Sequence, residues 1–221
     1  MGRKLKPKAV KVVCNNCFKI GNGVKSIGLG AFSSCTNLKS INIPGSVTSI
    51  GDFVFECCSS LTSINIPGSV TSIGDYAFYG CTSLTDVKIG NGVKSIGLGA
   101  FSSCTNLTSV NIPGSVTSIG SGAFCECTSL TSINIPEGVS SIMDTAFSSC
   151  TNLTSVNISG SVTSIGSGAF YFCSNLTEIH YGGTKEEWNQ LEKSTAWNSD
   201  TGYYTVYCTD GKLNKNGNEI E

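Results

Sequence analysis

The cysteines are the residues of this sequence whose type and spacing most suggest chemistry. The chain has 221 residues, with twelve cysteines and a single histidine, His180. Cys14 and Cys17 form a C-x-x-C pair, a spacing that occurs in zinc sites and in thiol redox motifs. A zinc site needs a second such pair or two histidines, and a redox motif needs a βαβ context, but the sequence supplies neither. We therefore predict no metal ion and no other cofactor.

Other catalytic patterns are missing from the sequence. There is no nucleophile elbow, phosphate-binding loop, metal-ligand signature or dinucleotide fingerprint. General acid and base catalysis would need two carboxylates placed across a cleft, whereas most Asp and Glu residues occur singly along the chain or close to its C-terminal end. The sequence therefore predicts a protein that is not an enzyme.

Composition narrows the class of partner. Only 13% of the residues are charged, against about 25% in an average globular protein. The net charge of -1 gives no basic surface for nucleic acid. No stretch approaches the roughly 20 apolar residues needed to span a bilayer, so we predict no membrane span. The basic start MGRKLKPKAVKVV lacks the apolar segment of a signal peptide, which leaves the question of export open.

A strict repeat of 23 residues dominates the sequence. The octapeptide AFSSCTNL occurs at 31–38, 100–107 and 146–153, at separations that are multiples of 23. Seven blocks run from Ile20 to His180, and a block reads I-P-x-x-V-x-S-I-x-x-x-A-F-x-x-C-x-x-L-x-x-I-x. The repeated phenylalanines are Phe32, Phe55, Phe78, Phe101, Phe124, Phe147 and Phe170. The repeated cysteines are Cys35, Cys58, Cys81, Cys104, Cys127, Cys150 and Cys173.

Blocks of this length predict a solenoid. A block this short cannot bury its own apolar side, so the repeats must stack and contact their neighbours. In L-T-S-I-N-I-P, the alternation of apolar and polar residues predicts a short strand with one buried face. Proline and glycine then turn the chain. A second short extended piece follows at V-x-S-I-G, and segments such as DYAFYGC are expected to form a helical turn.

The repeat resembles that of a known family. The pattern C-x-x-L-T-S-I-N-I-P-x-x-V-T-S-I-G-x-x-A-F is similar to the BspA-type leucine-rich repeats of bacterial and protozoan surface proteins, with cysteine in place of one repeat leucine. The resemblance covers seven consecutive copies over residues 20–180. The C-terminal stretches IHYGGTKEEWNQLEKSTAW and YTVYCTDGKL resemble the closing segment of such proteins.

This resemblance implies a fold and a function. The implied fold is an α/β-type solenoid, a right-handed coil of leucine-rich repeats with a parallel β-sheet on its concave face and with short strands and helical turns elsewhere. The implied function is adhesion or protein contact, without catalysis or cofactor, at the cell surface or in a secreted protein. The implied partner is a protein or glycan ligand, such as a host or matrix component.

The repeated cysteine is predicted to belong to the core. Buried free cysteine behaves as a small hydrophobic residue, and other leucine-rich repeats carry leucine at this position. Seven is an odd number, and cross-links would not suit a stack of equivalent positions, so we expect free thiols. Cys57 and Cys125 stand where other blocks have Ser, Gly or Phe, and we attribute them to sequence drift.

The ends of the stack need caps, because an open end would expose apolar side chains and unpaired strand edges. We predict a half-repeat cap over residues 1–19, seven repeats over 20–180 and a C-terminal cap over 181–221. Phe18 and Ile20 continue the strand spacing of the repeats, and Thr184 with Glu187 predicts a capping box that opens a short helix. The residues expected to cover the last coil, with a ligand platform as the alternative for the aromatic ones, are Trp188, Leu191, Trp197, Tyr203, Tyr204 and Tyr207.

The outward positions of the predicted strands offer the candidate binding surface. Most are Ser or Asn, but the third block has Asp86 and Lys88 two residues apart on one face. These two residues can be an exposed salt-bridged pair of little energetic weight, worth about 0 to 1 kcal/mol. Our hypothesis is that they are instead the polar centre of a ligand footprint. The flanking residues of the footprint are Ser63, Asn65, Ser109 and Asn111. Glu178 and His180, the other charged outward pair, are expected to hold the C-terminal cap in place.

Two alternatives stay open. The Ser and Asn rows can be solvated strand residues, with Asn or Thr side chains bonded along the stack. The array can also be a structural spacer or a self-assembling segment of a longer surface protein. Residues 19–38 and 88–107 are identical, which fits duplication and therefore either a spacer or a fast-evolving adhesin. The family resemblance favours the interaction module.

Overall fold

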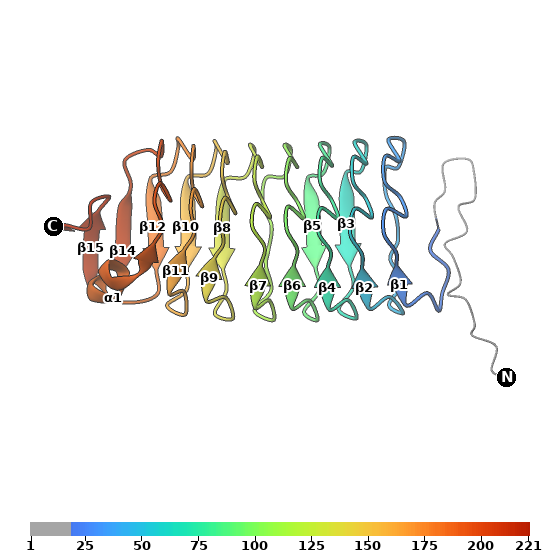
Figure 1. Cartoon of the computed structure of the whole chain (residues 1–221), viewed down its shortest axis with the longest axis horizontal. Helices are drawn as coiled ribbons and strands as arrows, with labels where there is room; N and C mark the ends of the chain where they lie inside the picture. Colours follow the sequence, from blue (N-terminus) through green and yellow to red (C-terminus); the bar gives the residue numbers. More distant parts are fainter. Residues whose placement is uncertain (1–18) are drawn as a thin grey trace.

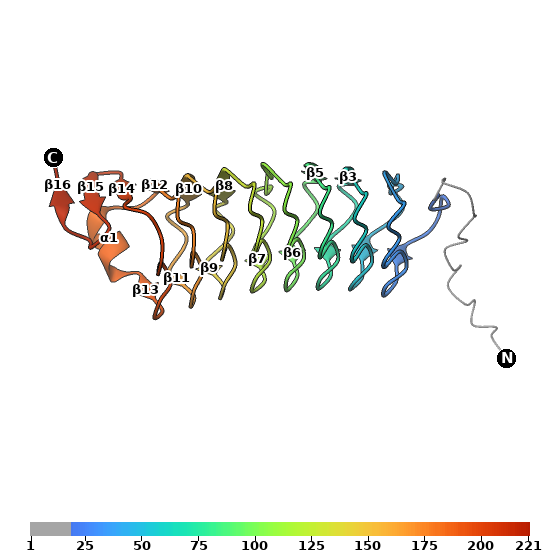
Figure 2. The same cartoon turned by 90° about the horizontal axis from the view of Figure 1, so that it is seen from above.

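The protein is a row of stacked coils with little curvature (Figures 1 and 2). The structure, a computed structural model, describes residues 19–221. Each repeat contributes one shorter strand and most contribute one longer strand, while the segments at Asn42 and Asn111 form only isolated bridges. Successive coils repeat the same path along the molecule (Figure 1). The predicted solenoid of parallel strands is confirmed. The predicted N-terminal cap, with Phe18 and the Cys14–Cys17 pair, lies outside the described residues apart from its last position.

Two sets of parallel strands line the coils, in register every 23 residues. The longer strands are β3 (Ser63–Ile66), β5 (Asp86–Ile89), β8 (Ser132–Ile135), β10 (Ser155–Ile158) and β12 (Glu178–Tyr181). The shorter strands are β1 (Ser26–Ile27), β2 (Ser49–Ile50), β4 (Ser72–Ile73), β6 (Ser95–Ile96), β7 (Ser118–Ile119), β9 (Ser141–Ile142) and β11 (Ser164–Ile165). In β3, β5 and β8 the burial alternates residue by residue, because successive side chains point to opposite faces of a strand.

The repeated phenylalanines form a continuous stack through the core. All seven side chains are buried. Neighbouring rings have centroids 5.0 to 5.6 Å apart and lie within 15° of parallel. Because dispersion and apolar burial both grow with contact area, this stack joins each coil to the next along the whole array.

The repeated cysteines form a ladder of thiol hydrogen bonds. Each buried Sγ donates to the carbonyl oxygen of the phenylalanine 26 residues earlier, at 3.1 to 3.2 Å. The donors are Cys58, Cys81, Cys104, Cys127, Cys150 and Cys173. The repeated cysteines are free thiols, as predicted, although Cys35 in the first repeat is only partly buried. Cys57, Cys125 and Cys208, whose state the repeat does not predict, are free as well. A thiol therefore supplies both apolar volume and one hydrogen bond between coils, which leucine could not.

The segment around each phenylalanine consists of tight turns rather than the expected helical turn. In the first repeat Gly30 has φ 59° and Ser34 has φ 58°, and later repeats have positive φ at equivalent positions. Left-handed residues at these places turn alternate amides toward the next coil. The resulting bonds are Gly30 to Asp52, Phe32 to Val54 and Ser34 to Glu56, each from N–H to carbonyl oxygen. A helix would use these amides internally, so stacking overrides the local helical preference.

Both sheets are interrupted in the middle of the array. The shorter strands form one sheet from β1 to β7 and another that starts at β9, and the longer strands divide between β5 and β8. In most coils a glycine follows the short strand and bonds to the preceding coil, as Gly120 does to the Ile96 carbonyl at 2.8 Å. A Cβ on Gly120 would lie 2.6 Å from backbone atoms of that coil. Met143 occupies this position after β9, and no such bond joins it to Ile119.

The C-terminal segment covers the last coil. It contains α1 (Lys185–Gln190), β13 (Glu192–Lys193), β14 (Thr205–Cys208), β15 (Gly211–Asn214) and β16 (Glu219–Ile220). The predicted capping box between Thr184 and Glu187 is present. Buried Trp197 meets the last stacked ring, Phe170, edge-on at 6.1 Å. Tyr203 does not cover the coil as expected, since its side chain is 96% exposed.

Candidate interaction surface

The outward side chains of the longer strands form one polar surface, here called the long-strand face. The structure brings the six predicted footprint residues together on it. Ser63 pairs with Asp86 and Asn65 with Lys88 in the β3–β5 register, and Lys88 forms an isolated bridge with Asn111. Ser109 lies two residues before Asn111 on the same face, and all six residues are exposed.

The structure contradicts the alternative interpretation of Asp86 and Lys88 as a salt-bridged pair. Asp86 and Lys88 do not form an ion pair, and within residues 19–221 the ion pairs are Glu178 with His180 and Lys185 with Glu219. Residues two apart on a strand have Cα atoms about 6.6 Å apart, and their side chains stand perpendicular to the sheet. Both charges therefore point outward, where each is available to a partner.

Threonines beside the long-strand face bond along the stack. The Oγ1 of Thr85 donates to the carbonyl oxygen of Thr62 at 3.1 Å, and that of Thr154 donates to Thr131 at 3.0 Å. Thr177 continues the series by donating to Thr154. The predicted bonding of Thr side chains between repeats is thus present, and it stiffens the edge of the surface.

The end of the long-strand face next to the cap carries larger side chains. His180 Nε2 lies 3.1 Å from Glu178 Oε2, and the imidazole stacks on Tyr207 with centroids 4.8 Å apart. Because Tyr207 belongs to β14, this contact joins the last repeat to the cap, as expected for His180. Lys212 of β15 pairs with Tyr207 and extends the same row. Sequence reasoning missed this extension, because the 23-residue period ends at His180 and no longer fixes the register.

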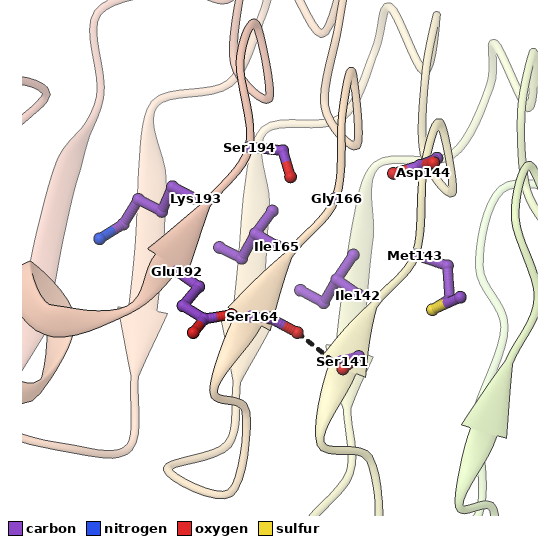
Figure 3. A pocket seen from close by; sticks show the side chains of 10 residues that line it. All are labelled: Ser141, Ile142, Met143, Asp144, Ser164, Ile165, Gly166, Glu192, Lys193 and Ser194. Atoms are coloured by element: carbon purple, nitrogen blue, oxygen red, sulfur yellow. Dashed lines mark hydrogen bonds between the residues drawn. The ribbon is translucent and has the colours of Figure 1, made fainter.

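A shallow depression lies on the opposite sheet, across β9, β11 and β13 (Figure 3). Ser141 and Ser164, which both line it, share a hydrogen bond of 2.7 Å between their hydroxyls (Figure 3). Gly166 leaves space between Met143 and Ser194, the flanking residues of the neighbouring strands (Figure 3). The sequence contains one sign of this feature: Met143 stands at a repeat position where most other repeats have glycine.

The depression is polar and carries the carboxylates of Asp144 and Glu192. Asp144 Oδ1 already accepts a hydrogen bond from the Ser167 amide at 2.7 Å. Lys193 also borders the depression, but its ammonium donates to the Trp188 carbonyl and lies over the Trp188 ring. Burial lowers the pKa of Lys193. The depression therefore offers hydroxyls and carboxylates with no catalytic arrangement among them.

Residues 19–221 contain no group of three or more His, Cys, Asp or Glu side chains arranged to hold a metal ion. In the same residues no helix is long and apolar enough to cross a membrane.

Comparison with known proteins identifies the repeat. A family model described as "BspA type Leucine rich repeat region (6 copies)" matches residues 12–120 and 94–199. The chain belongs to the BspA-type leucine-rich repeat family. BspA-type repeats commonly form interaction or surface modules, and leucine-rich repeat proteins are generally non-catalytic. No curated protein matches the chain.

Solved structures of leucine-rich repeat proteins agree with this family. The leucine-rich repeat protein of T. pallidum (TpLRR) is 35% identical, with a TM-score of 0.65, over 69% of this chain and 72% of that one. A leucine-rich repeat protein from Bacteroides ovatus is 30% identical, with a TM-score of 0.62. That similarity covers 77% of this chain and 55% of the other, so this BspA-type chain spans about half of the Bacteroides protein.

Proposed function

We propose that the protein is an interaction or adhesion module that binds a protein or glycan partner through the long-strand face and catalyses no reaction. The observation that carries this proposal is the common exposure of Ser63, Asn65, Asp86 and Lys88 on two paired strands. The backbone groups of these strands are bonded within the sheet, so the side chains alone are left to contact a partner.

The chemistry of this face supports a polar partner surface. Its Ser and Asn side chains offer both donors and acceptors at a strand spacing of about 4.8 Å. Asp86 and Lys88 add one charge of each sign in the middle of the array. Charges that project from a rigid sheet favour specificity and fast association more than raw affinity. We propose a cell-surface or secreted location for this module on the basis of its family.

A binding experiment with matched variants tests the footprint. Purified protein is offered to arrays of extracellular-matrix proteins and glycans, and to itself, beside the variant Asp86→Ser/Lys88→Asn. That variant restores the residues of the neighbouring repeats and leaves the net charge unchanged. The control variant Lys94→Thr/Asp144→Ser makes the same kind of exchange at exposed positions away from the long-strand face.

Saturable binding that falls in the Asp86/Lys88 variant and persists in the control variant supports the proposal. Binding that is equal in all three proteins would move the site away from this footprint. Self-association alone, unchanged in either variant, would favour the structural spacer and contradict the interaction module.

A further inference from the structure

Aromatic side chains gather on the turns of the second and third repeats. Phe53 and Tyr76 stack with ring centroids 5.3 Å apart, and Tyr79 meets Tyr76 edge-on at 5.9 Å. Tyr79 is exposed, and the other two rings are half-buried. We call these three residues the aromatic cluster. The Ser and Asn rows of the long-strand face have no comparable feature.

The fold does not need the aromatic cluster. Phe53 and Tyr76 occupy a repeat position where the backbone is left-handed, with φ values of 56° and 53°. The equivalent residues of the first, fourth, fifth and seventh repeats are Gly30, Gly99, Gly122 and Gly168. Glycine adopts this conformation without strain, whereas a bulky residue does so at a cost. The two rings are therefore placed here against the local backbone preference.

Carboxylates lie beside the aromatic cluster. Asp52 and Asp75 directly precede Phe53 and Tyr76 and are exposed. Asp52 Oδ1 accepts a hydrogen bond from the amide of Asp75 at 2.9 Å, so one oxygen positions the side chain and the other is left for solvent or a ligand. Glu56 occupies the repeat position of Tyr79 one coil earlier.

No cation of the described chain neutralises these carboxylates. The ion pairs of residues 19–221 all lie at the C-terminal end of the molecule. A second aromatic pair, Tyr171 and Phe172, is also exposed, with centroids 4.9 Å apart. It has fewer acidic neighbours, because Ser167 stands at the repeat position of Asp52 and Asp75, which leaves Asp144 of the preceding coil as the one carboxylate of this kind beside it. The second and third repeats therefore combine the stacked rings of the aromatic cluster with carboxylates that have no ion-pair partner in residues 19–221.

We propose that the aromatic cluster, with Asp52, Glu56 and Asp75, is a docking surface for an arginine-rich segment of a partner protein. A guanidinium stacks on an aromatic face and pairs with a carboxylate through its fork of N–H donors. Tyrosine and arginine are also enriched among the residues that carry binding energy at interfaces. This surface lies on the turns and is separate from the long-strand face.

Synthetic peptides test the surface directly. Oligoarginine, oligolysine and oligoglutamate peptides of equal length are titrated into the full chain and followed by fluorescence anisotropy. We expect oligoarginine to bind saturably, oligolysine to bind more weakly because an ammonium does not stack, and oligoglutamate not to bind. Failure of oligoarginine to bind, or equal binding of oligoarginine and oligolysine, would overturn the proposal.

Two variants locate the contact. Phe53→Gly/Tyr76→Gly restores the glycines of other repeats, and we expect about a tenfold loss of oligoarginine affinity without a lower melting temperature. Asp52→Asn/Asp75→Asn keeps the Oδ1 acceptors and should reduce both affinity and salt dependence. The matched control is Thr145→Gly, the same change at the equivalent left-handed position with φ 53°, and it should leave affinity unchanged.

Undiminished binding by both double variants would overturn the proposal. The basic residues of the chain's own segment 1–18 are a competing occupant. If exchanging Arg3, Lys4, Lys6, Lys8 and Lys11 for Gln strengthened oligoarginine binding, that segment would be the occupant and the assignment to a partner protein would be wrong. Unchanged binding in that variant supports the assignment.

Discussion

At the residue scale, small polar groups hold the coils together without using charge. Thr85 donates to the Thr62 carbonyl and Cys81 to the Phe55 carbonyl, and similar bonds recur along the stack. The sequence predicted the buried thiol ladder from the spacing of the cysteines together with the leucine that other leucine-rich repeats carry at this position. It could not identify the carbonyl acceptors, because these depend on how one coil sits on the next.

The buried thiols should make the protein sensitive to alkaline pH. Burial raises the pKa of Cys58 and of Cys173 from the ordinary value of 9.0 to about 12. Burial also raises the pKa values of the Cys104, Cys127 and Cys150 thiols. At a pH between the unfolded and the folded pKa of these thiols, the unfolded chain binds fewer protons than the folded chain. The free energy of unfolding should therefore fall as pH rises above 9.

Urea unfolding at a series of pH values measures this effect. Each fully protected thiol contributes a slope of about 1.4 kcal/mol per pH unit above the unfolded pKa, and the stability it provides is fully present below that pKa. Replacing Cys81 and Cys104 with alanine should lower stability at neutral pH but make the alkaline slope shallower. An unchanged slope in that variant would show that the ladder is not the source of the pH dependence.

At the element scale, one glycine position controls how closely the coils approach. A Cβ on Gly97 would lie 2.7 Å from the carbonyl carbon of Gly74 and from the amide nitrogen of Asp75. Real Cβ atoms do not make such contacts, so a side chain here must push the coils apart. Met143 occupies the same repeat position, and the sheet of shorter strands ends beside it. The repeat pattern predicts the glycine, but the interruption of the sheet becomes visible only in the structure.

Alanine substitutions at two glycines separate close approach from chain flexibility. Gly97→Ala should lower the free energy of unfolding by about 1–3 kcal/mol, because the new Cβ overlaps backbone that has little room to move. Gly114→Ala is the control, since nothing lies within 4 Å of a Cβ built there. It should be neutral or stabilising by up to about 1 kcal/mol. Urea melts of both variants measure the difference, and equal losses would contradict this account.

At the scale of the whole molecule, stability depends on closing the open end of the Phe stack. Trp197 meets Phe170, and Trp188 and Tyr204 pack against Trp197 with centroids 6.0 and 6.3 Å apart. Sequence reasoning identified the capping box and the buried tryptophans. It misplaced Tyr203 and did not anticipate that β14 continues the sheet, because beyond His180 no repeat period is left to fix which residues face inward.

Removing the central tryptophan should loosen the array from its C-terminal end. Trp197→Ala should cost about 3–5 kcal/mol in the free energy of unfolding, as for other buried aromatic residues. Amide hydrogen exchange should rise first in the last repeat and only later near β3 and β5, since each coil contacts mainly its neighbours. The exposed Tyr203→Ala serves as control and should change neither measurement. A uniform rise in exchange along the chain would contradict local opening.

The fixed reach of the contacts between coils makes the length of the protein adjustable. The thiol bonds span 26 residues and the threonine bonds span 23, whichever coils they join. A splice between equivalent positions of two coils would therefore leave each donor facing an acceptor of the same kind. Residues 19–38 and 88–107 are identical and start 69 residues apart, so a crossover between them would remove three whole coils. The shortened chain would keep its first repeat and its C-terminal cap. The cap would lie about 14 Å, or three strand spacings, nearer to the first repeat.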